Sequence, residues 1–143
     1  MTNASVSEYT IPDTEALVID SIEYPGIKVS YNDGVGDSPK DNYILYYNPE
    51  NYQMAFLKYT VTYRSQETSE NYNLIKYGDW SEVGGLVLPT KLTWYKLDDD
   101  GKLGEVRNEA EFSNIQVSSE VPADDTFAQP EDAKISEAPT TTD

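Results

Sequence analysis

The alternation of apolar and polar positions is clearest between residues 52 and 63. The odd positions form one apolar face, made of Ala55, Leu57, Tyr59, Val61 and Tyr63. The even positions begin apolar at Met54 and Phe56 and become polar from Lys58 onward. Because successive side chains of a strand point to opposite faces, this period of two predicts a strand over 52–63. One end of that strand is expected to be covered on both faces.

Shorter segments of the same character follow one another along the chain, separated by turn residues. We predict strands over 16–23, 26–31, 42–47, 71–77, 81–83, 86–89, 91–97, 102–107 and 109–118. A short amphipathic helix is the alternative at the start of the first segment. Phe112, Ile115 and Val117 break the strict alternation of the last segment, which predicts a β-bulge near Ser113 and Asn114.

Glycine, proline, asparagine and aspartate mark the ends of these segments. Turns are predicted at 24–26, 48–51, 66–70, 84–85 and 98–101, with a corner at 78–80 and a loop over 32–41. The glycines at 84–85 suit a tight hairpin, because glycine adopts positive φ without strain. The chain therefore divides into about nine or ten strands and no long helix.

This pattern predicts an all-β fold, a curved antiparallel meander that resembles a half-barrel and contains little or no helix. We expect a β domain over residues 15–130, after a disordered lead over 1–14. An acidic, disordered tail rich in threonine and proline is expected over 131–143. Phe127 is expected to pack back on the edge of the sheet.

The charge of the chain argues against one class of partner. Its 143 residues include 10 Lys and Arg against 26 Asp and Glu, a net charge of −16. Such a field repels phosphate backbones, and the basic residues are scattered, so no nucleic acid is expected as a partner. The 12 tyrosines suit half-exposed strand faces, either as ordinary strand residues or as a ligand surface.

Histidine and cysteine are both absent. Their absence removes cysteine nucleophiles, Ser-His-Asp triads and nearly all zinc and copper sites, so we expect no catalytic residue, metal site or cofactor. A carboxylate pair could still hydrolyse glycosides, and Asp79 is the first acid to consider. Its alternative role is to cap a turn. The aspartates of 32–41 could bind calcium, but their spacing does not match an EF-hand, which favours a solvated loop.

The chain is expected to be soluble. Its first residues have neither the basic region nor the apolar region of a signal peptide. No run approaches the roughly 18 apolar residues of a membrane span. A membrane tether would therefore belong to an N-terminal part that this chain lacks.

Residues 42–135 contain short motifs in a particular order. They are Tyr43-Ile-Leu-Tyr-Tyr-Asn-Pro-Glu-Asn-Tyr52, Leu57-Lys-Tyr-Thr-Val-Thr-Tyr63, Tyr77-Gly-Asp-Trp80, Gly85-Leu-Val-Leu-Pro89, Leu92-Thr-Trp-Tyr95, Phe112-Ser-Asn-Ile-Gln-Val117 and the stretch from Pro122 through Phe127 to Pro130. This order resembles an uncharacterised family of Gram-negative envelope proteins, often lipoproteins, whose sheet is similar to that of the LolA/LolB lipoprotein carriers. The resemblance implies a periplasmic or outer-membrane-associated protein with an apolar cavity between a concave sheet and covering helices.

These observations favour a non-catalytic binding or carrier module that holds a lipid or acyl ligand on a concave sheet. The candidate ligand-contacting residues are Met54, Phe56, Leu57, Tyr59, Leu92 and Trp94. A flexible methionine among aromatic rings suits an adaptable pocket, although the same residues could form an ordinary core or a homodimer interface. A glycan-binding or scaffolding module of an envelope complex is the alternative function, and a carboxylate hydrolase is the third. A row of solvent-facing rings would favour the glycan module, and a closed apolar pocket would favour the carrier.

Overall fold

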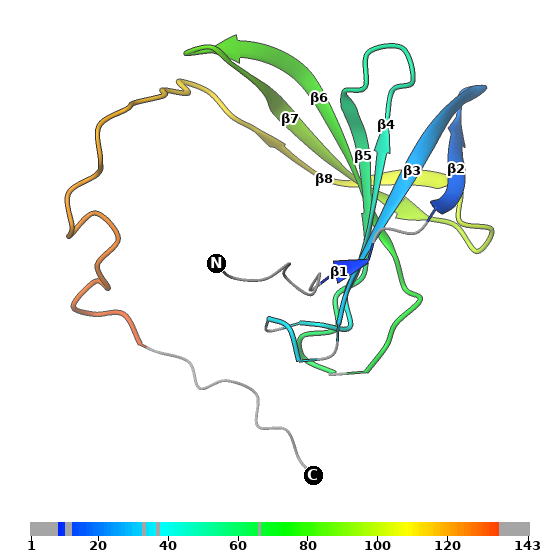
Figure 1. The fold of residues 1–143 in the computed structure, drawn as a ribbon, viewed down its shortest axis with the longest axis horizontal. Helices are drawn as coiled ribbons and strands as arrows, with labels where there is room; N and C mark the ends of the chain where they lie inside the picture. The colour runs from blue at the N-terminus through cyan, green and yellow to red at the C-terminus, as the bar shows by residue number, and fades with distance from the viewer. Residues whose placement is uncertain (1–8, 11–12, 33, 37, 66, 135–143) are drawn as a thin grey trace, which may run out of the picture.

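The structure is a computed structural model that describes residues 9–10, 13–32, 34–36, 38–65 and 67–134. Its strands are β1 (Tyr9–Thr10), β2 (Asp13–Ile19), β3 (Ile22–Tyr31), β4 (Asn42–Tyr47), β5 (Met54–Tyr59), β6 (Asn73–Val83), β7 (Leu86–Leu97) and β8 (Leu103–Glu111). They form one antiparallel sheet in the order β1-β3-β4-β5-β6-β7-β8, and β2 pairs with β3 (Figure 1). The described residues contain no helix, and β8 does not pair back to β1 or β2. The predicted all-β, curved and open antiparallel meander is confirmed.

The predicted bounds of the β domain, residues 15 and 130, are not settled by the positions of the strands. β1 and the first residues of β2 fall within the predicted disordered lead over 1–14. Residues 1–8, 11–12 and 135–143 lie outside the described residues. The domain boundaries at residues 15 and 130 therefore stay predictions.

The hairpin of β2 and β3 corrects the predicted turn at 24–26. The two strands are joined by Asp20 and Ser21, whose φ angles are 50° and 66°. Two residues of positive φ make the hairpin turn whose twist matches that of its strands. Pro25 instead lies inside β3, opposite a bulge that begins after Thr14 in β2. Since proline has no N–H for the ladder, a bulge is where a strand can accept it. The helical alternative for this region is also wrong.

β5 is shorter than the predicted strand over 52–63 and contains a bulge at Ala55. The register with β4 shifts by one residue there, and Met54 pairs with Tyr47. The extra residue reverses the alternation of side chains at this end of the strand. Met54 and Phe56 therefore lie on opposite faces, whereas the period of two predicted one face for both.

A buried carboxylate holds the chain that follows β5. Asp41 is 6% exposed, and its Oδ1 accepts hydrogen bonds from the Thr62 N–H at 2.6 Å and the Thr60 hydroxyl at 3.4 Å. The Thr60 hydroxyl in turn accepts from the Asn42 N–H at 2.9 Å. These contacts replace the ladder that was predicted to continue to residue 63. The prediction of a solvated loop over 32–41 is therefore wrong for its last residue, Asp41, which is buried.

β6 and β7 form the longest hairpin of the sheet. The predicted tight turn is confirmed at Gly84 and Gly85, whose φ angles are 57° and 82°. Each of the two strands is continuous where two shorter ones were predicted. β6 replaces the strands predicted over 71–77 and 81–83 but begins only at Asn73, and β7 replaces those predicted over 86–89 and 91–97. The predicted corner at 78–80 is therefore wrong, because β6 runs through these residues without interruption.

β8 is an edge strand with two bulges. The predicted turn at 98–101 before it is confirmed, with Gly101 at φ 74°. The register with β7 shifts at Arg107 and again near Gly104. A Cβ at Gly104 would lie 2.7 Å from the carbonyl oxygen of Lys96, so this bulge requires glycine. One bulged strand thus replaces the two that were predicted.

The chain after β8 continues beside the sheet without forming a strand, and Val117 lies against Gly84 at the β6–β7 turn. The Phe112 N–H donates to the carbonyl oxygen of Thr90 at 2.8 Å, but β8 has already ended, so the predicted strand over 109–118 is too long. The predicted bulge at 113–114 is wrong because those residues lie beyond the strand. Phe127 is 86% exposed, which corrects its predicted packing on the sheet edge. Figure 1 shows this part of the chain leading away from the sheet.

The core lies on one face of the sheet, which we call the core face. Ile44, Tyr46, Phe56 and Leu74 are its buried residues. Leu17, Ile19, Tyr24, Ala55, Tyr72, Tyr95 and Leu97 pack around them. The ring of Tyr24 meets that of Phe56 edge to face, with 5.1 Å between centroids, although β4 separates their strands. Side chains from β2 to β7 thus converge on a small core.

Candidate ligand-binding face

The face opposite the core is apolar across five strands. The register pairs Ile27 with Leu45, Leu45 with Leu57, Leu57 with Ile75, and Ile75 with Trp94, in one row from β3 to β7. We call this side the tyrosine face; its members are Ile27, Val29, Tyr31, Tyr43, Leu45, Tyr47, Met54, Leu57, Tyr59, Ile75, Tyr77, Leu92, Trp94 and Ala110. No strand of the described residues packs on it as a second layer. Ile75, in the middle of this row, is 7% exposed, and Leu45, Leu57 and Trp94 are half-buried. An apolar sheet face without a second layer is a candidate binding site.

One end of the tyrosine face contains an open pocket of about 400 Å³. Its lining consists of Ile27, Leu45, Tyr46, Tyr47, Tyr52 and Met54. The rings of Tyr47 and Tyr52 stack with 6.0 Å between their centroids. The Asn48 carbonyl oxygen accepts from the Tyr52 N–H, which holds the β4–β5 turn beside the pocket. Because the only polar side-chain atoms in this lining are phenol hydroxyls and a thioether, it suits an alkyl chain.

Tyrosine rings line the middle of the same face. The rings of Tyr31 and Tyr43 meet edge to face at 6.1 Å, and Tyr43 pairs across the strands with Tyr59. Burial raises the pKa of Tyr43, and the Asp41 carboxylate raises it further. Burial, and then the nearby Tyr59, raise the pKa of Tyr77. These phenols are therefore neutral at ordinary pH, with partly desolvated rings.

We expect the protein to lose stability as pH rises above 10, the ordinary pKa of tyrosine. Burial also raises the pKa of Tyr46, so three phenols release their protons later in the folded state than in the unfolded state. The stability that these three phenols contribute is complete below pH 10. It is lost as pH rises through their pKa values in the folded state. Urea unfolding and tyrosinate absorbance, both followed from pH 8 to pH 12, would measure the effect.

Tyr77→Phe is the matched variant for this titration, since it removes one of the three shifted groups. It should make the alkaline loss of stability less steep. Identical tyrosinate titrations in the native protein and in urea would contradict the expectation.

Five of the six candidate residues share the tyrosine face. They are Met54, Leu57, Tyr59, Leu92 and Trp94. Phe56 is the exception, because it is 3% exposed within the core on the other face. The bulge at Ala55 explains this correction, since it separates Phe56 from Met54. Contact of the other five with a ligand stays a prediction.

Sequence reasoning missed most of the pocket lining. Ile27, Leu45, Tyr47 and Tyr52 were not among the candidates, although Met54 was. The alternation of Ile27 with its neighbours was visible in the sequence. The register that brings β3 and β4 beside Met54 depends on pairing between distant segments, and no local pattern reports it.

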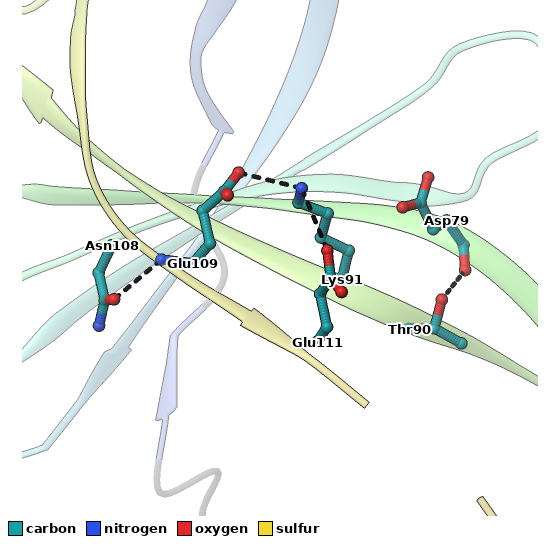
Figure 2. A network of polar contacts seen from close by, with 6 residues as sticks. All are labelled: Asp79, Thr90, Lys91, Asn108, Glu109 and Glu111. Atoms are coloured by element: carbon teal, nitrogen blue, oxygen red, sulfur yellow. Dashed lines mark hydrogen bonds and ion pairs between the residues drawn. The ribbon is translucent and has the colours of Figure 1, made fainter. Parts of the chain in front are cut away.

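The core face ends in a polar cluster that joins β7 to β8. The ammonium of Lys91 lies 3.1 Å from Glu109 and 3.5 Å from Glu111 (Figure 2). The hydrogen bond to Glu109 is the main cause that raises the pKa of Lys91. A polar pocket of about 420 Å³ lies here and is lined by Lys91, Glu109, Lys76 and Asp79 among others. Exposed ion pairs of this kind contribute little to stability, and we assign the cluster a role in edge pairing.

Asp79, the acid singled out for hydrolysis, does not cap a turn. It lies within β6 at φ 50°, and its backbone carbonyl oxygen accepts from the Thr90 hydroxyl at 2.5 Å. Figure 2 shows its carboxylate apart from the Lys91–Glu109 ion pair. Asp79 and Glu109 line the same polar pocket, where the ammonium of Lys91 is paired with Glu109.

No group of three or more acidic, histidine or cysteine side chains among the described residues could hold a metal ion. Asp33 and Asp37, on which the calcium hypothesis depends, lie outside the described residues. The described part of the chain contains no helix with the length and apolar character needed to cross a membrane.

Comparison with known proteins gives a partial likeness. No protein-family model matches the chain, and no curated protein matches it. Among solved structures, the chain is similar to a LolA superfamily protein from Nitrosomonas europaea, with 13% sequence identity and a TM-score of 0.45. The match covers 75% of this chain and 46% of that protein, so the chain spans less than half of its length. A likeness of this extent assigns neither a family nor a ligand.

Proposed function

We propose that the chain is a non-catalytic binding module that holds an apolar ligand, such as an acyl chain, on the tyrosine face. The observation that carries the proposal is the unbroken apolar row from Ile27 to Trp94, with an open apolar pocket at one end. Soluble proteins rarely leave such a surface without a binding partner.

The chemistry of the face fits a ligand of variable shape. Met54 is unbranched and polarisable, so it can follow different chain conformations. Tyr47 and Tyr52 offer stacked rings with wet hydroxyls. We place this activity in the periplasm or at the outer membrane, as the resemblance of residues 42–135 implies. Cell fractionation would test that location.

Native mass spectrometry of the purified protein, followed by organic extraction, is the first test. A lipid that copurifies in near-stoichiometric amount and is released by the solvent would support the proposal. Failure of the purified protein to bind any added long-chain alcohol or acid would overturn it.

Leu57→Asn is expected to weaken binding of dodecanol by about tenfold, because it puts an amide in the middle of the apolar row. Lys76→Asn introduces the same amide on the neighbouring strand but on the core face, and it should leave the affinity unchanged. Isothermal titration calorimetry below the solubility limit of the alcohol measures both. Equal losses in the two variants would show that the tyrosine face is not the site.

A glycan-binding or scaffolding module is the second candidate function. The contacts of Tyr31 with Tyr43 and the pairing of Tyr43 with Tyr59 favour it, because successive half-exposed rings are platforms for sugar stacking. The two functions differ in their ligands, so binding of soluble oligosaccharides in the absence of alcohol binding would select the glycan module.

A further inference from the structure

A second pocket lies at the opposite end of the tyrosine face, where β8 forms the edge. It has a volume of about 360 Å³ and is lined by Tyr59, Asn73, Trp94, Arg107 and Asn108. We call it the Arg107 corner. Its position follows from the register, which pairs Tyr59 with Asn73 and Trp94 with Asn108.

The first bulge of β8 supplies the charge of this corner. Arg107 is the extra residue between Val106, which pairs with Tyr95, and Asn108. Its side chain reaches past β7 to β6, where Nη1 donates to Oδ1 of Asn73 at 3.1 Å. A regular strand would place fewer residues here, so the bulge turns an arginine onto the tyrosine face, where the register also places Asn73 and Asn108.

The corner offers several hydrogen-bond donors beside the hydroxyl of Tyr59, which can both donate and accept. Oδ1 of Asn73 already accepts from Arg107, and Oδ1 of Asn108 already accepts from the Glu109 N–H at 2.9 Å. Figure 2 shows the Asn108 amide directed away from the Lys91–Glu109 ion pair. Both amide nitrogens and the other guanidinium N–H groups are left to donate. A site that offers donors and a positive charge recognises a group rich in acceptors and negatively charged.

The net charge of the whole chain opposes the binding of an anion. The chain carries a net charge of −16, so its overall field repels anions. None of the residues that line the corner is acidic. A preference for an anion would therefore have to come from local contacts with Arg107, Asn73 and Asn108.

The two pockets lie at the two ends of one strand. Met54 lines the apolar pocket and Tyr59 lines the Arg107 corner, and both belong to β5. Their partners in β4, Tyr47 and Tyr43, are four residues apart, so at about 3.3 Å per residue the two ends are roughly 13 Å apart. Leu57 lies between them on the same face. A flexible alkyl chain could span this distance over an apolar path.

We propose that the ligand of the tyrosine face is an anionic amphiphile. Its carboxylate or phosphate head group binds at the Arg107 corner, and its alkyl chain runs along β5 toward the pocket of Met54. This inference rests on the proposed function and adds the head group to it.

Calorimetric titration of the full chain with five probes of three kinds tests the inference, with the long-chain anions kept below their critical micelle concentrations and dodecanol below its solubility limit. Dodecanoate and dodecyl phosphate carry both the head and the chain. Dodecanol carries the chain alone, and acetate and inorganic phosphate carry the head alone. We expect the two anionic amphiphiles to bind about tenfold more tightly than dodecanol, and the short anions to bind far more weakly than either.

Arg107→Gln is the test variant, and Arg64→Gln is its control, because Arg64 is the only other arginine and does not line the corner. Arg107→Gln should lower the affinity for dodecanoate about tenfold, to that of dodecanol, and leave dodecanol binding unchanged. Arg64→Gln should change neither. Circular dichroism confirms that both variants fold, as expected from the exposure of both side chains.

The outcomes separate the head group from the proposed function itself. Equal binding of dodecanol and dodecanoate by the wild type would overturn the head-group site and leave the apolar site in place. Inorganic phosphate or acetate binding as tightly as the long-chain probes would overturn the amphiphile in favour of a plain anion site. Equal effects of Arg107→Gln and Arg64→Gln would also overturn it. No binding of any long-chain probe would remove the proposed function as well.

Discussion

Leu74→Ala is expected to lower the free energy of unfolding by about 3–4 kcal/mol, because it empties the centre of the core. Leu74 is 0% exposed and packs with Ile44, Tyr46 and Phe56. The loss combines the transfer of buried methyl groups to water with the cavity left among neighbours that cannot collapse fully. Since a domain of this size is stable by only about 5–15 kcal/mol, the variant should be close to unfolding at 37 °C.

Urea denaturation followed by circular dichroism measures this loss. Leu86→Ala is the matched control, since Leu86 is 51% exposed at the start of β7. It should cost less than about 1 kcal/mol. If the two substitutions cost the same, the cluster around Leu74 is not the core of the protein.

Asp41→Ala is expected to cost about 3 kcal/mol, because it leaves the buried Thr62 N–H and Thr60 hydroxyl without their acceptor. Asp41→Asn retains a carbonyl oxygen at the same place and should cost about 1 kcal/mol. The contrast separates the loss of an acceptor from the loss of charge. Chemical denaturation of both variants gives the two values.

Asp98 provides a control with similar hydrogen bonds and different burial. Its Oδ1 accepts from the N–H groups of Asp100 at 3.1 Å and Lys102 at 2.7 Å, in an exposed turn. Water can replace it there, so Asp98→Ala should cost at most about 1 kcal/mol. A loss for Asp98→Ala as large as that for Asp41→Ala would mean that burial does not account for the effect.

The fold class could be predicted because most strands have a clear period of two between strong turn residues. The Gly84–Gly85 turn is the best case, since glycine alone adopts those angles freely. The turn at Asp20 and Ser21 was missed because the nearby Pro25 and Gly26 are the stronger turn signals. A strand accepts that proline only because its neighbour bulges, and the neighbour is known only after the sheet forms.

Two residues of the candidate site also depend on strand pairing, which no local sequence pattern reports. The sequence composition of β5 predicted an apolar surface, but the bulge at Ala55 decided that Met54 belongs to it and Phe56 to the core. Arg107 was not among the candidate residues, because no local pattern distinguishes one charged residue in an edge strand. Its position next to Asn73 depends on a second bulge and on pairing across three strands. Bulges leave a weak trace in the sequence, and here they determine which side chains share a face.

The bulges of β8 also bear on how this open sheet avoids polymerisation. A straight edge strand would present a regular row of N–H and C=O groups on which another chain could add as a further strand. The register shifts at Gly104 and Arg107 interrupt that row twice within nine residues. β8 carries Glu105, Glu109 and Glu111 against the single Arg107, and Lys91 of β7 pairs with two of these glutamates, so a second β8 would be repelled only weakly. Replacing the bulges by a regular strand should therefore favour fibrils before it changes the fold of the monomer.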